Sequence, residues 1–205
     1  MIGTFSVDHS LLNDGRISPD ALAKLTEFTI ERQKHQCGCC SIKAKKKIRL
    51  ITRERNTKPS KDNIIAVCPA CFALHNGGMS IDGERIGSMI LLPQLTQVEL
   101  IRFWYVAAYY RYFDSGLKKS HANSYLNELS SLSAAVVRLN GTDNPMYFAS
   151  LLKSFKESAY ENREAALGGF RWLPNWNNEI FKDTLQAYNL GGSFLDDAFL
   201  AELTD

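Results

Sequence analysis

The spacing of hydrophobic positions changes about halfway along the chain, from short mixed elements to long helical repeats. Ser18 is a natural N-cap, and Pro19 suits the first helical position because that position needs no amide donor. Leu22, Leu25 and Phe28 follow at helical spacing, so a helix is predicted from residue 18 to about residue 34.

Short strands and turns are predicted between this helix and residue 93. The segment "KKIRLITRER" alternates apolar and polar residues at Ile48 and Leu50, which predicts a strand with one face buried. The segment "GTFSV" near the N-terminus predicts another short strand. The segment "NTKPSKDN" has the composition of a loop, and "MSIDGERIG" places Asp82 and Gly83 between apolar runs, which predicts a hairpin.

After residue 93 the pattern is almost entirely helical. Thr96 and Glu99 form a capping box that opens the first of these helices. Gly141 and Gly168 are C-terminal signals that end two later helices. The predicted helices cover residues 96–113, 126–140, 145–168, 178–190 and 193–203.

Aromatic residues gather in two segments of this helical part. The segment "LIRFWYVAAYYRYF" (residues 100–113) is apolar on all sides of a helix, so it is either a core helix or a surface for a partner. The segment "GGFRWLPNWNN" (residues 168–178) places Phe170, Trp172 and Trp176 on a predicted loop, which either packs on the helices or binds a partner.

These patterns predict an α+β fold in two regions, an N-terminal helix and Cys-rich module over residues 1–92 and a helical region over residues 93–205. The 205 residues are 45% hydrophobic, which is enough to bury a core. No segment has the pattern of a signal peptide, and the apolar windows are shorter than the roughly 20 residues that span a bilayer. We therefore expect a cytoplasmic protein, and in that compartment clustered cysteines more often bind metal or act in catalysis than form disulfides.

All five cysteines lie between residues 37 and 71. Cys37 and Cys40 form one Cys-x-x-Cys pair, and Cys68 and Cys71 form a second. Two such turns supply the four thiolates that a tetrahedral Zn²⁺ prefers, so a structural zinc site is predicted at these four residues. A redox motif needs only one pair, while an iron–sulfur cluster also uses four cysteines. Cys39 is interpreted as a spare thiol in the first turn.

A basic stretch lies between the two cysteine pairs. Residues 43–61 hold nine Lys or Arg against one acid, Glu54, although the net charge of the whole chain is only +2. One interpretation is a solvated face that offsets the charge of four metal-bound thiolates. The other is a set of phosphate contacts in a nucleic-acid-binding zinc module.

The two Cys turns, the strand between them and the segment "NIIAVCPACFALH" resemble an HNH-type endonuclease with its stabilising zinc. That resemblance implies a ββα module, and Asn63 and His75 match two of the family's functional positions. The catalytic histidine that should end the strand is missing from Ile48–Thr52, and Phe72 stands directly after Cys71. HNH chemistry needs a general base and metal ligands, so we expect no enzymatic activity, with a residual endonuclease as the remote alternative. Asn63 is then a loop-fixing residue and His75 a core or surface histidine.

The segments "ERQKHQCGCC", "IAVCPACFALHN" and "MILLPQLTQVEL", in this order and in a chain of about two hundred residues, resemble the IcmJ/DotN family of the Dot/Icm type IVB secretion systems. The resemblance implies an HNH-like fold with a structural zinc and a non-catalytic role in the type IV coupling complex. It also implies that the partners are the C-terminal tail of the coupling ATPase and other coupling-complex subunits, which hold the protein at the cytoplasmic face of the inner membrane.

Overall fold

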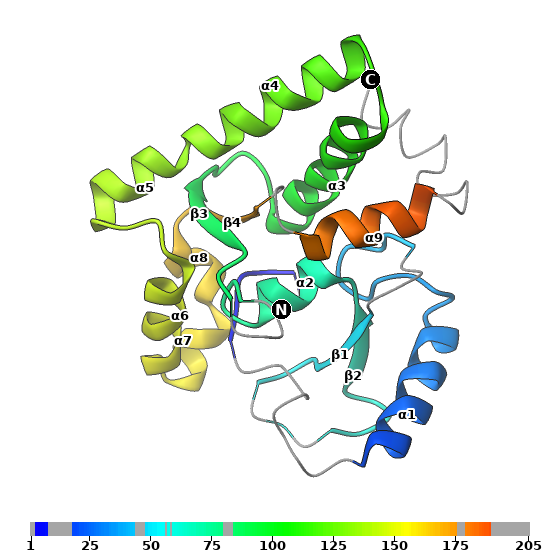
Figure 1. The fold of residues 1–205 in the computed structure, drawn as a ribbon. Coiled ribbons are helices and arrows are strands. Elements are labelled where there is room, and N and C mark those ends of the chain that lie inside the picture. Colours follow the sequence, from blue (N-terminus) through cyan, green and yellow to red (C-terminus); the bar gives the residue numbers. More distant parts are fainter. Residues whose placement is uncertain are drawn as a thin grey trace.

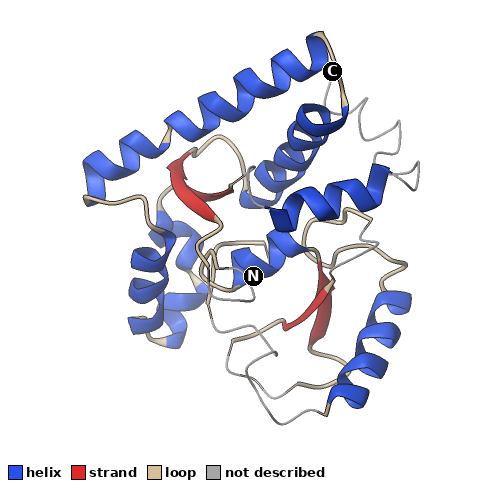
Figure 2. Ribbon diagram, viewed as in Figure 1, coloured by secondary structure: helices blue, strands red, loops and turns tan. Residues whose placement is uncertain are grey.

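In the computed structural model, helices surround two small antiparallel sheets (Figures 1 and 2). The structure describes residues 3–7, 18–43, 48–55, 57, 59–79, 84–175 and 179–189. The strands are β1 Arg49–Thr52, β2 Ile64–Val67, β3 Gly87–Leu91 and β4 Phe170–Pro174. The helices are α1 Pro19–Arg32, α2 Pro69–His75, α3 Gln97–Phe113, α4 Leu117–Ser131, α5 Ser133–Asn140, α6 Pro145–Ser154, α7 Glu157–Glu161, α8 Arg163–Leu167 and α9 Glu179–Asn189. The predicted α+β class is confirmed.

The hairpin β1–β2 lies between α1 and α2 (Figure 1). Ser18 caps α1 as predicted, because its hydroxyl accepts the amide of Ala21. The prediction that only one face of the first strand is buried is wrong. Leu50 packs with α1 on one face of the hairpin, and Ile51 belongs to the main core on the other. A helix on each side leaves no face of this two-stranded sheet for water.

The segment Gly3–Val7 is buried but forms no strand, so that prediction is also wrong. Its backbone pairs with the end of α2 instead of with a strand. The Ser6 amide donates to the Leu74 carbonyl at 3.1 Å, and the Ser6 carbonyl accepts the Gly77 amide at 3.0 Å. These bonds hold the N-terminal segment against α2.

α3 is a helix of the main core. Thr96 and Glu99 form the predicted capping box at its start. Trp104 and Tyr105 are fully buried, and the Trp104 ring meets that of Phe181 on α9 with centroids 4.9 Å apart. The core-helix interpretation is therefore confirmed for residues 100–108, while residues 109–113 are half-buried.

The second sheet joins segments about eighty residues apart in the sequence. β3 pairs with β4 in a register that runs from Gly87 opposite Pro174 to Leu91 opposite Phe170. The prediction of a loop over residues 168–178 is wrong for this part, because the backbone finds a strand partner in β3. Trp172 is fully buried within β4. The Trp172 amide donates to the side-chain oxygen of Gln97 at 2.7 Å, and the Trp172 carbonyl accepts from the side-chain nitrogen of Gln97 at 2.8 Å. Trp176 lies outside the described residues.

Two of the predicted long helices are broken. The helix over residues 126–140 falls in two pieces, α4 and α5, which meet at Leu132, and Leu139 is 66% exposed rather than part of a buried stripe. The helix over residues 145–168 is divided into α6, α7 and α8. α6 ends at Ser154 because the Arg55 side chain donates hydrogen bonds to the carbonyls of Leu152 and Phe155 at the C-terminus of this helix.

Other predictions concern the remaining turns and helices. Met79 and Arg85 form an antiparallel bridge, as a hairpin there requires, while the Asp82–Gly83 turn lies outside the described residues. α9 confirms the helix predicted at residues 178–190, and the one at residues 193–203 also falls outside the described part. None of the described helices combines the length and the apolar character needed to cross a membrane.

Contacts cross the predicted boundary between residues 92 and 93. The Tyr160 hydroxyl donates to the Val7 carbonyl at 3.1 Å, and the Thr4 hydroxyl donates to the Glu164 carboxylate at 3.1 Å. β3 and β4 also lie on opposite sides of that boundary. The division into residues 1–92 and 93–205 stays a prediction, and any two units would share a contiguous core.

Candidate metal centre

The first cysteine pair lies in a tight turn between α1 and β1. The Cys37 amide donates to the Ile42 carbonyl at 2.8 Å, and the Ser41 amide donates to the Cys37 carbonyl at 2.9 Å. Ser41 adopts a positive φ of 63°, which closes the turn. The bridge between Gln36 and Lys43 continues the pairing on both sides. The backbone of residues 36–43 is thereby folded back so that both thiols of the pair belong to one cluster.

The second pair is placed by the junction of β2 and α2. Cys68 follows the last residue of β2 and is the N-cap of α2, where Pro69 occupies the first turn. The Phe72 amide donates to the Cys68 carbonyl at 2.8 Å, which starts the helix and brings Cys71 one turn on. A strand followed directly by a helix start is a rigid support for two thiols.

The four paired cysteines converge in the core. The sulfur atoms of Cys37, Cys40, Cys68 and Cys71 all lie within 4.8 Å of one another. Three of these residues are fully buried and Cys37 is 2% exposed. The Cys40 and Cys68 sulfurs are 3.8 Å apart, far beyond a disulfide bond of about 2.05 Å, and all five cysteines are free thiols.

The spacing of the sulfurs fits a tetrahedral ion. Metal–sulfur bonds of about 2.3 Å in a tetrahedron place the sulfurs about 3.8 Å apart, which is the distance between Cys40 and Cys68. Burial excludes water from the ligand positions. Four thiols in this arrangement can hold a metal ion.

Without a metal ion, the pKa values of the cluster thiols are shifted in opposite directions. Burial raises the pKa of Cys40 and of Cys71 well above the ordinary value for a thiol. Burial also acts to raise the pKa of Cys37, but hydrogen bonds from the neighbouring thiols outweigh it and hold that pKa well below the usual range. These directions favour the thiolate at Cys37 and the protonated thiol at Cys40 and Cys71, and a bound cation would favour the thiolate form of its ligands.

Cys39 stays outside the group of four. Its side chain is partly exposed, unlike the four cluster thiols. A hydrogen bond with Cys71 lowers the pKa of Cys39, but burial and the charges at Cys37 and Cys68 together raise it above the ordinary value. The spare-thiol interpretation is compatible with this position.

The two residues that match HNH positions have structural roles. The Asn63 side-chain oxygen accepts the Ser60 amide at 2.8 Å, and its nitrogen donates to the Thr57 hydroxyl at 3.3 Å, which fixes the loop before β2. His75 is 1% exposed, and its Nδ1 lies 2.6 Å from the Ser6 hydroxyl. His75 is a core histidine that ties the N-terminal segment to α2.

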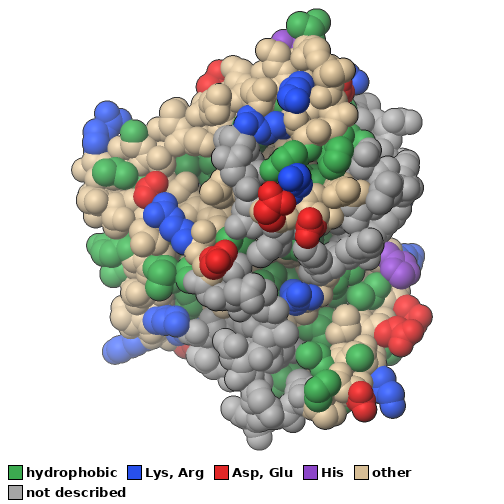
Figure 3. All heavy atoms as spheres, in the orientation of Figure 1, with side chains coloured by type: hydrophobic (Ala, Val, Ile, Leu, Met, Phe, Trp, Pro, Cys, Tyr) green, Lys and Arg blue, Asp and Glu red, His purple; other side chains and the backbone are tan. Residues whose placement is uncertain are grey.

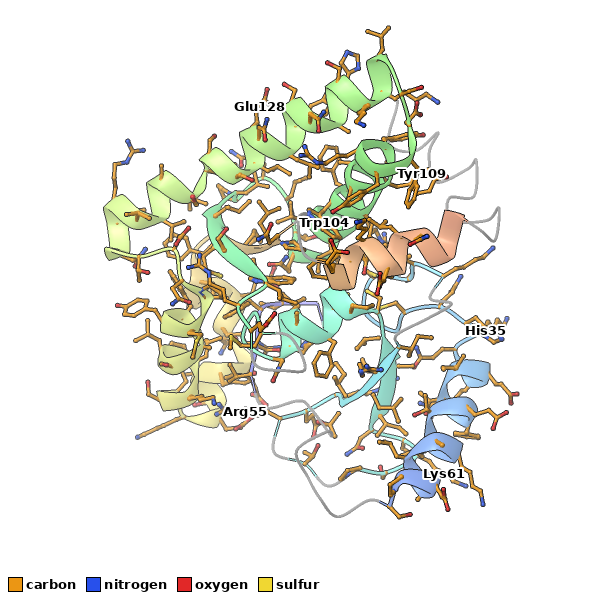
Figure 4. The ribbon with its side chains drawn as sticks, viewed as in Figure 1. His35, Arg55, Lys61, Trp104, Tyr109 and Glu128 are labelled. Atoms are coloured by element: carbon orange, nitrogen blue, oxygen red, sulfur yellow. The ribbon has the colours of Figure 1, made fainter. Side chains whose placement is uncertain are left out.

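One member of the basic stretch has a role that sequence reasoning missed. Arg55 is buried and points toward the helices α6 and α7 (Figure 4). It donates to the carbonyls of Leu152 and Phe155, pairs with Glu157 at 3.1 Å, and lies 3.8 Å above the Tyr160 ring. Nothing local in the sequence separates Arg55 from its exposed neighbours, because all its partners are about a hundred residues away. The lysines at positions 45, 46, 47 and 58 lie outside the described residues.

Comparison with known proteins adds one finding. No family model matches the chain. The chain is similar to the type 4 apparatus protein DotN of Legionella pneumophila, with 26% identity over 150 residues. That alignment covers 71% of this chain and 69% of DotN, so it includes much more than a cysteine motif.

Proposed function

We propose that this chain, which belongs to the IcmJ/DotN family of the Dot/Icm type IVB secretion systems, is a non-catalytic, zinc-stabilised adaptor of the secretion apparatus. The observation that carries the proposal is the similarity to a type 4 apparatus protein over 71% of the chain. The partners that follow from this family are the C-terminal tail of the coupling ATPase and other subunits of the coupling complex. The protein acts in the cytoplasm, held at the inner membrane through those partners, and helps to recruit effector proteins.

Zinc is the proposed metal, and its role is structural. Cys37, Cys40, Cys68 and Cys71 are its ligands, and four protein thiolates leave no open coordination position for a substrate. The ion joins the turn after α1 to the junction of β2 and α2. The binding free energy of such a site contributes directly to folding.

The absence of enzymatic activity is proposed from the residues at the HNH positions. β1 carries no histidine, aspartate or glutamate, and Phe72 follows Cys71. Asn63 and His75 are engaged in structural hydrogen bonds with Ser60 and Ser6. A nuclease needs a general base and a second, open metal site, and these side chains offer neither.

Calorimetric titration tests the proposal. The purified, zinc-loaded chain is titrated with the purified C-terminal tail of the coupling ATPase from the same secretion system, at low and at high salt. Tight binding that changes little with salt is the expected result, because apolar burial rather than phosphate-like charge drives it. No binding at either salt concentration would overturn the adaptor role.

Two control measurements test for nucleic-acid binding and for endonuclease activity. Duplex DNA titrated under the same conditions should not bind; binding through phosphate contacts would be recognised by a steep loss of affinity as salt rises. If it does bind, and if exchanging Lys45, Lys46 and Lys47 for Glu abolishes it, the basic stretch is a nucleic-acid site. Metal-dependent nicking of plasmid DNA with Mg²⁺ or Mn²⁺ that disappears in the Asn63→Ala and His75→Ala variants would show an endonuclease.

A further inference from the structure

The elements that carry the four cluster thiols contain almost no charged side chains. β2 and α2 have no Lys, Arg, Asp or Glu, and residues 3–7, which lie against α2, have none either. In the turn of residues 36–43 the only such residue is Lys43, and it is exposed. A divalent ion bound by four thiolates leaves a net charge of about −2, and a buried net charge is costly unless it is hydrogen-bonded or paired. A cation close to the cluster would therefore stabilise the metal-bound centre.

Arg102 reaches the first cysteine turn from α3. Its Nε atom donates to the Cys40 carbonyl at 2.8 Å, although the two residues are 62 positions apart in the sequence. The pKa of Cys39 in the same turn depends first on a hydrogen bond with Cys71 and on burial, but the charge of Arg102 also acts on it and lowers it. Arg102 is half-buried, so water screens this charge less than it screens a surface cation. The guanidinium thus lies where it contacts the turn and affects its sulfurs.

The described cations of the basic stretch are engaged elsewhere or exposed. The Arg49 side chain donates to the neighbouring Ile48 carbonyl at 3.1 Å, and Arg55 binds the end of α6. Three further cations are exposed: Lys43, Arg53 and Lys61. On the face shown in Figure 3, the described Lys and Arg side chains are scattered among other residues rather than gathered in one patch.

Glu99 is an acid on the same helix, one turn before Arg102. Its carboxylate accepts hydrogen bonds from the amide and the hydroxyl of Thr96, both at 2.7 Å, which hold it at the start of α3. Glu99 is exposed, so water screens its charge. The bond that Arg102 makes is with the Cys40 carbonyl, and its charge is directed to the cysteine turn.

We propose that Arg102 is a positioning residue of the metal centre, which fixes the turn that carries Cys40 and places a positive charge beside the metal-bound thiolates. This inference rests on the proposed structural zinc and goes beyond it, because it assigns part of the metal affinity to the helical part of the chain. Groups that support metal ligands from outside tune the site, and their loss typically weakens metal binding about 10–100-fold. The charge balance that one interpretation of the sequence assigns to the basic stretch is then provided by Arg102.

The zinc affinity of the full chain, measured by competition with a chromophoric chelator at fixed pH, tests this inference. Arg102→Met should bind zinc at least about tenfold more weakly than the wild-type chain. Arg102→Lys keeps a cation and a donor, so it should recover most of the affinity. Loading with Co²⁺ in place of zinc gives a second readout, because the thiolate-to-cobalt absorption band should shift in Arg102→Met when the charge beside the sulfurs is removed.

Two control variants separate this role from a purely structural one. The Arg171 Nε donates to the Leu95 carbonyl at 2.7 Å, and β4 contains no cysteine, so Arg171→Met removes a similar bond away from the ligands. It should lower the melting temperature and leave the zinc affinity and the cobalt band unchanged. Lys43→Met, the control for the basic stretch, should also leave both unchanged.

The outcomes distinguish the inference from the zinc site on which it rests. If the wild-type chain binds no zinc, the proposed metal itself is overturned. If the wild-type chain binds zinc and Arg102→Met keeps its affinity and its cobalt band, Arg102 only stabilises the fold and the structural zinc stands. Weakening in Lys43→Met as large as in Arg102→Met would return the charge balance to the basic stretch. Should Arg102→Met not fold, Arg102→Gln retains a donor without the charge, and wild-type zinc affinity in that variant would refute the role of the charge.

Discussion

At the scale of single residues, the five cysteines differ in what their sulfurs contact. Cys68 is one of four buried thiols within 4.8 Å of one another, and Cys39 in the neighbouring turn is not. We expect Cys68→Ser to lose the metal and much of the thermal stability, because a serine hydroxyl is a poor replacement for a zinc-bound thiolate. Cys39→Ser should retain the metal and a nearly unchanged melting temperature.

Metal content by mass spectrometry and thermal unfolding, measured on both variants, check this prediction. A well-folded Cys68→Ser protein without metal would show that the fold does not depend on a zinc ion. A Cys39→Ser protein without metal would show that the ligand set is wrong.

Arg55 is the second residue whose contacts lead to a prediction. The Arg55 guanidinium donates hydrogen bonds to two carbonyls at the end of α6 and stacks on Tyr160, and the Arg55 side chain is 7% exposed. Arg55→Met should destabilise the protein by about 2–3 kcal/mol, because two carbonyls at the end of α6 lose a charged donor and the Tyr160 ring loses its stacked cation. Arg53→Met, two residues away and exposed, is the matched control and should change stability little. Urea unfolding of both variants measures the difference, and equal midpoints would show that Arg55 contributes no more than a surface cation.

At the scale of elements, the pairing of β3 with β4 allows no side chain at Gly87. A Cβ atom there would overlap the Leu173 carbonyl oxygen and the Trp172 indole. We expect Gly87→Ala to cost about 1–3 kcal/mol and to alter the fluorescence of Trp172, because the two strands must separate to make room. Gly141→Ala is the control. A Cβ atom at position 141 would meet no atom within 4 Å, so the expected loss of stability of about 1 kcal/mol arises from the positive φ of this residue alone. An unchanged emission spectrum in Gly87→Ala would contradict this close packing.

Elements that depend on neighbouring residues could be predicted from the sequence. The N-cap Ser18, the capping box of α3 and the two Cys-x-x-Cys turns each act within a few residues, and the structure has all of them. β4 could not be predicted, because its partner strand lies about eighty residues away. The break after α6 was missed for the same reason, since the responsible side chain is that of Arg55. Aromatic residues next to glycine and proline indicate a loop until a distant strand supplies hydrogen-bond partners.

At the scale of the whole molecule, the cysteine cluster and the helical part share one core. Cys71 and Phe72 belong to the same cluster of buried residues as Trp104, and the Ala70 amide donates to the Tyr105 hydroxyl at 3.5 Å. The Tyr160 hydroxyl and the Arg55 guanidinium add contacts between the N-terminal part and helices α6–α8. The support that a bound metal ion would give to α2 would therefore be transmitted to elements that carry no ligand.

Removal of the metal by a strong chelator tests this coupling. All three tryptophans and most of the described helices lie after residue 93, so tryptophan fluorescence and far-UV circular dichroism report on the part without cysteines. We expect both signals to change together and the melting temperature to fall by about 10 °C or more, because the binding energy of a structural zinc is folding energy. Addition of Zn²⁺ should restore them. If the chelator extracts the metal and both signals stay constant, residues 93–205 fold independently of the cysteine centre, and the boundary between residues 92 and 93 separates two true domains.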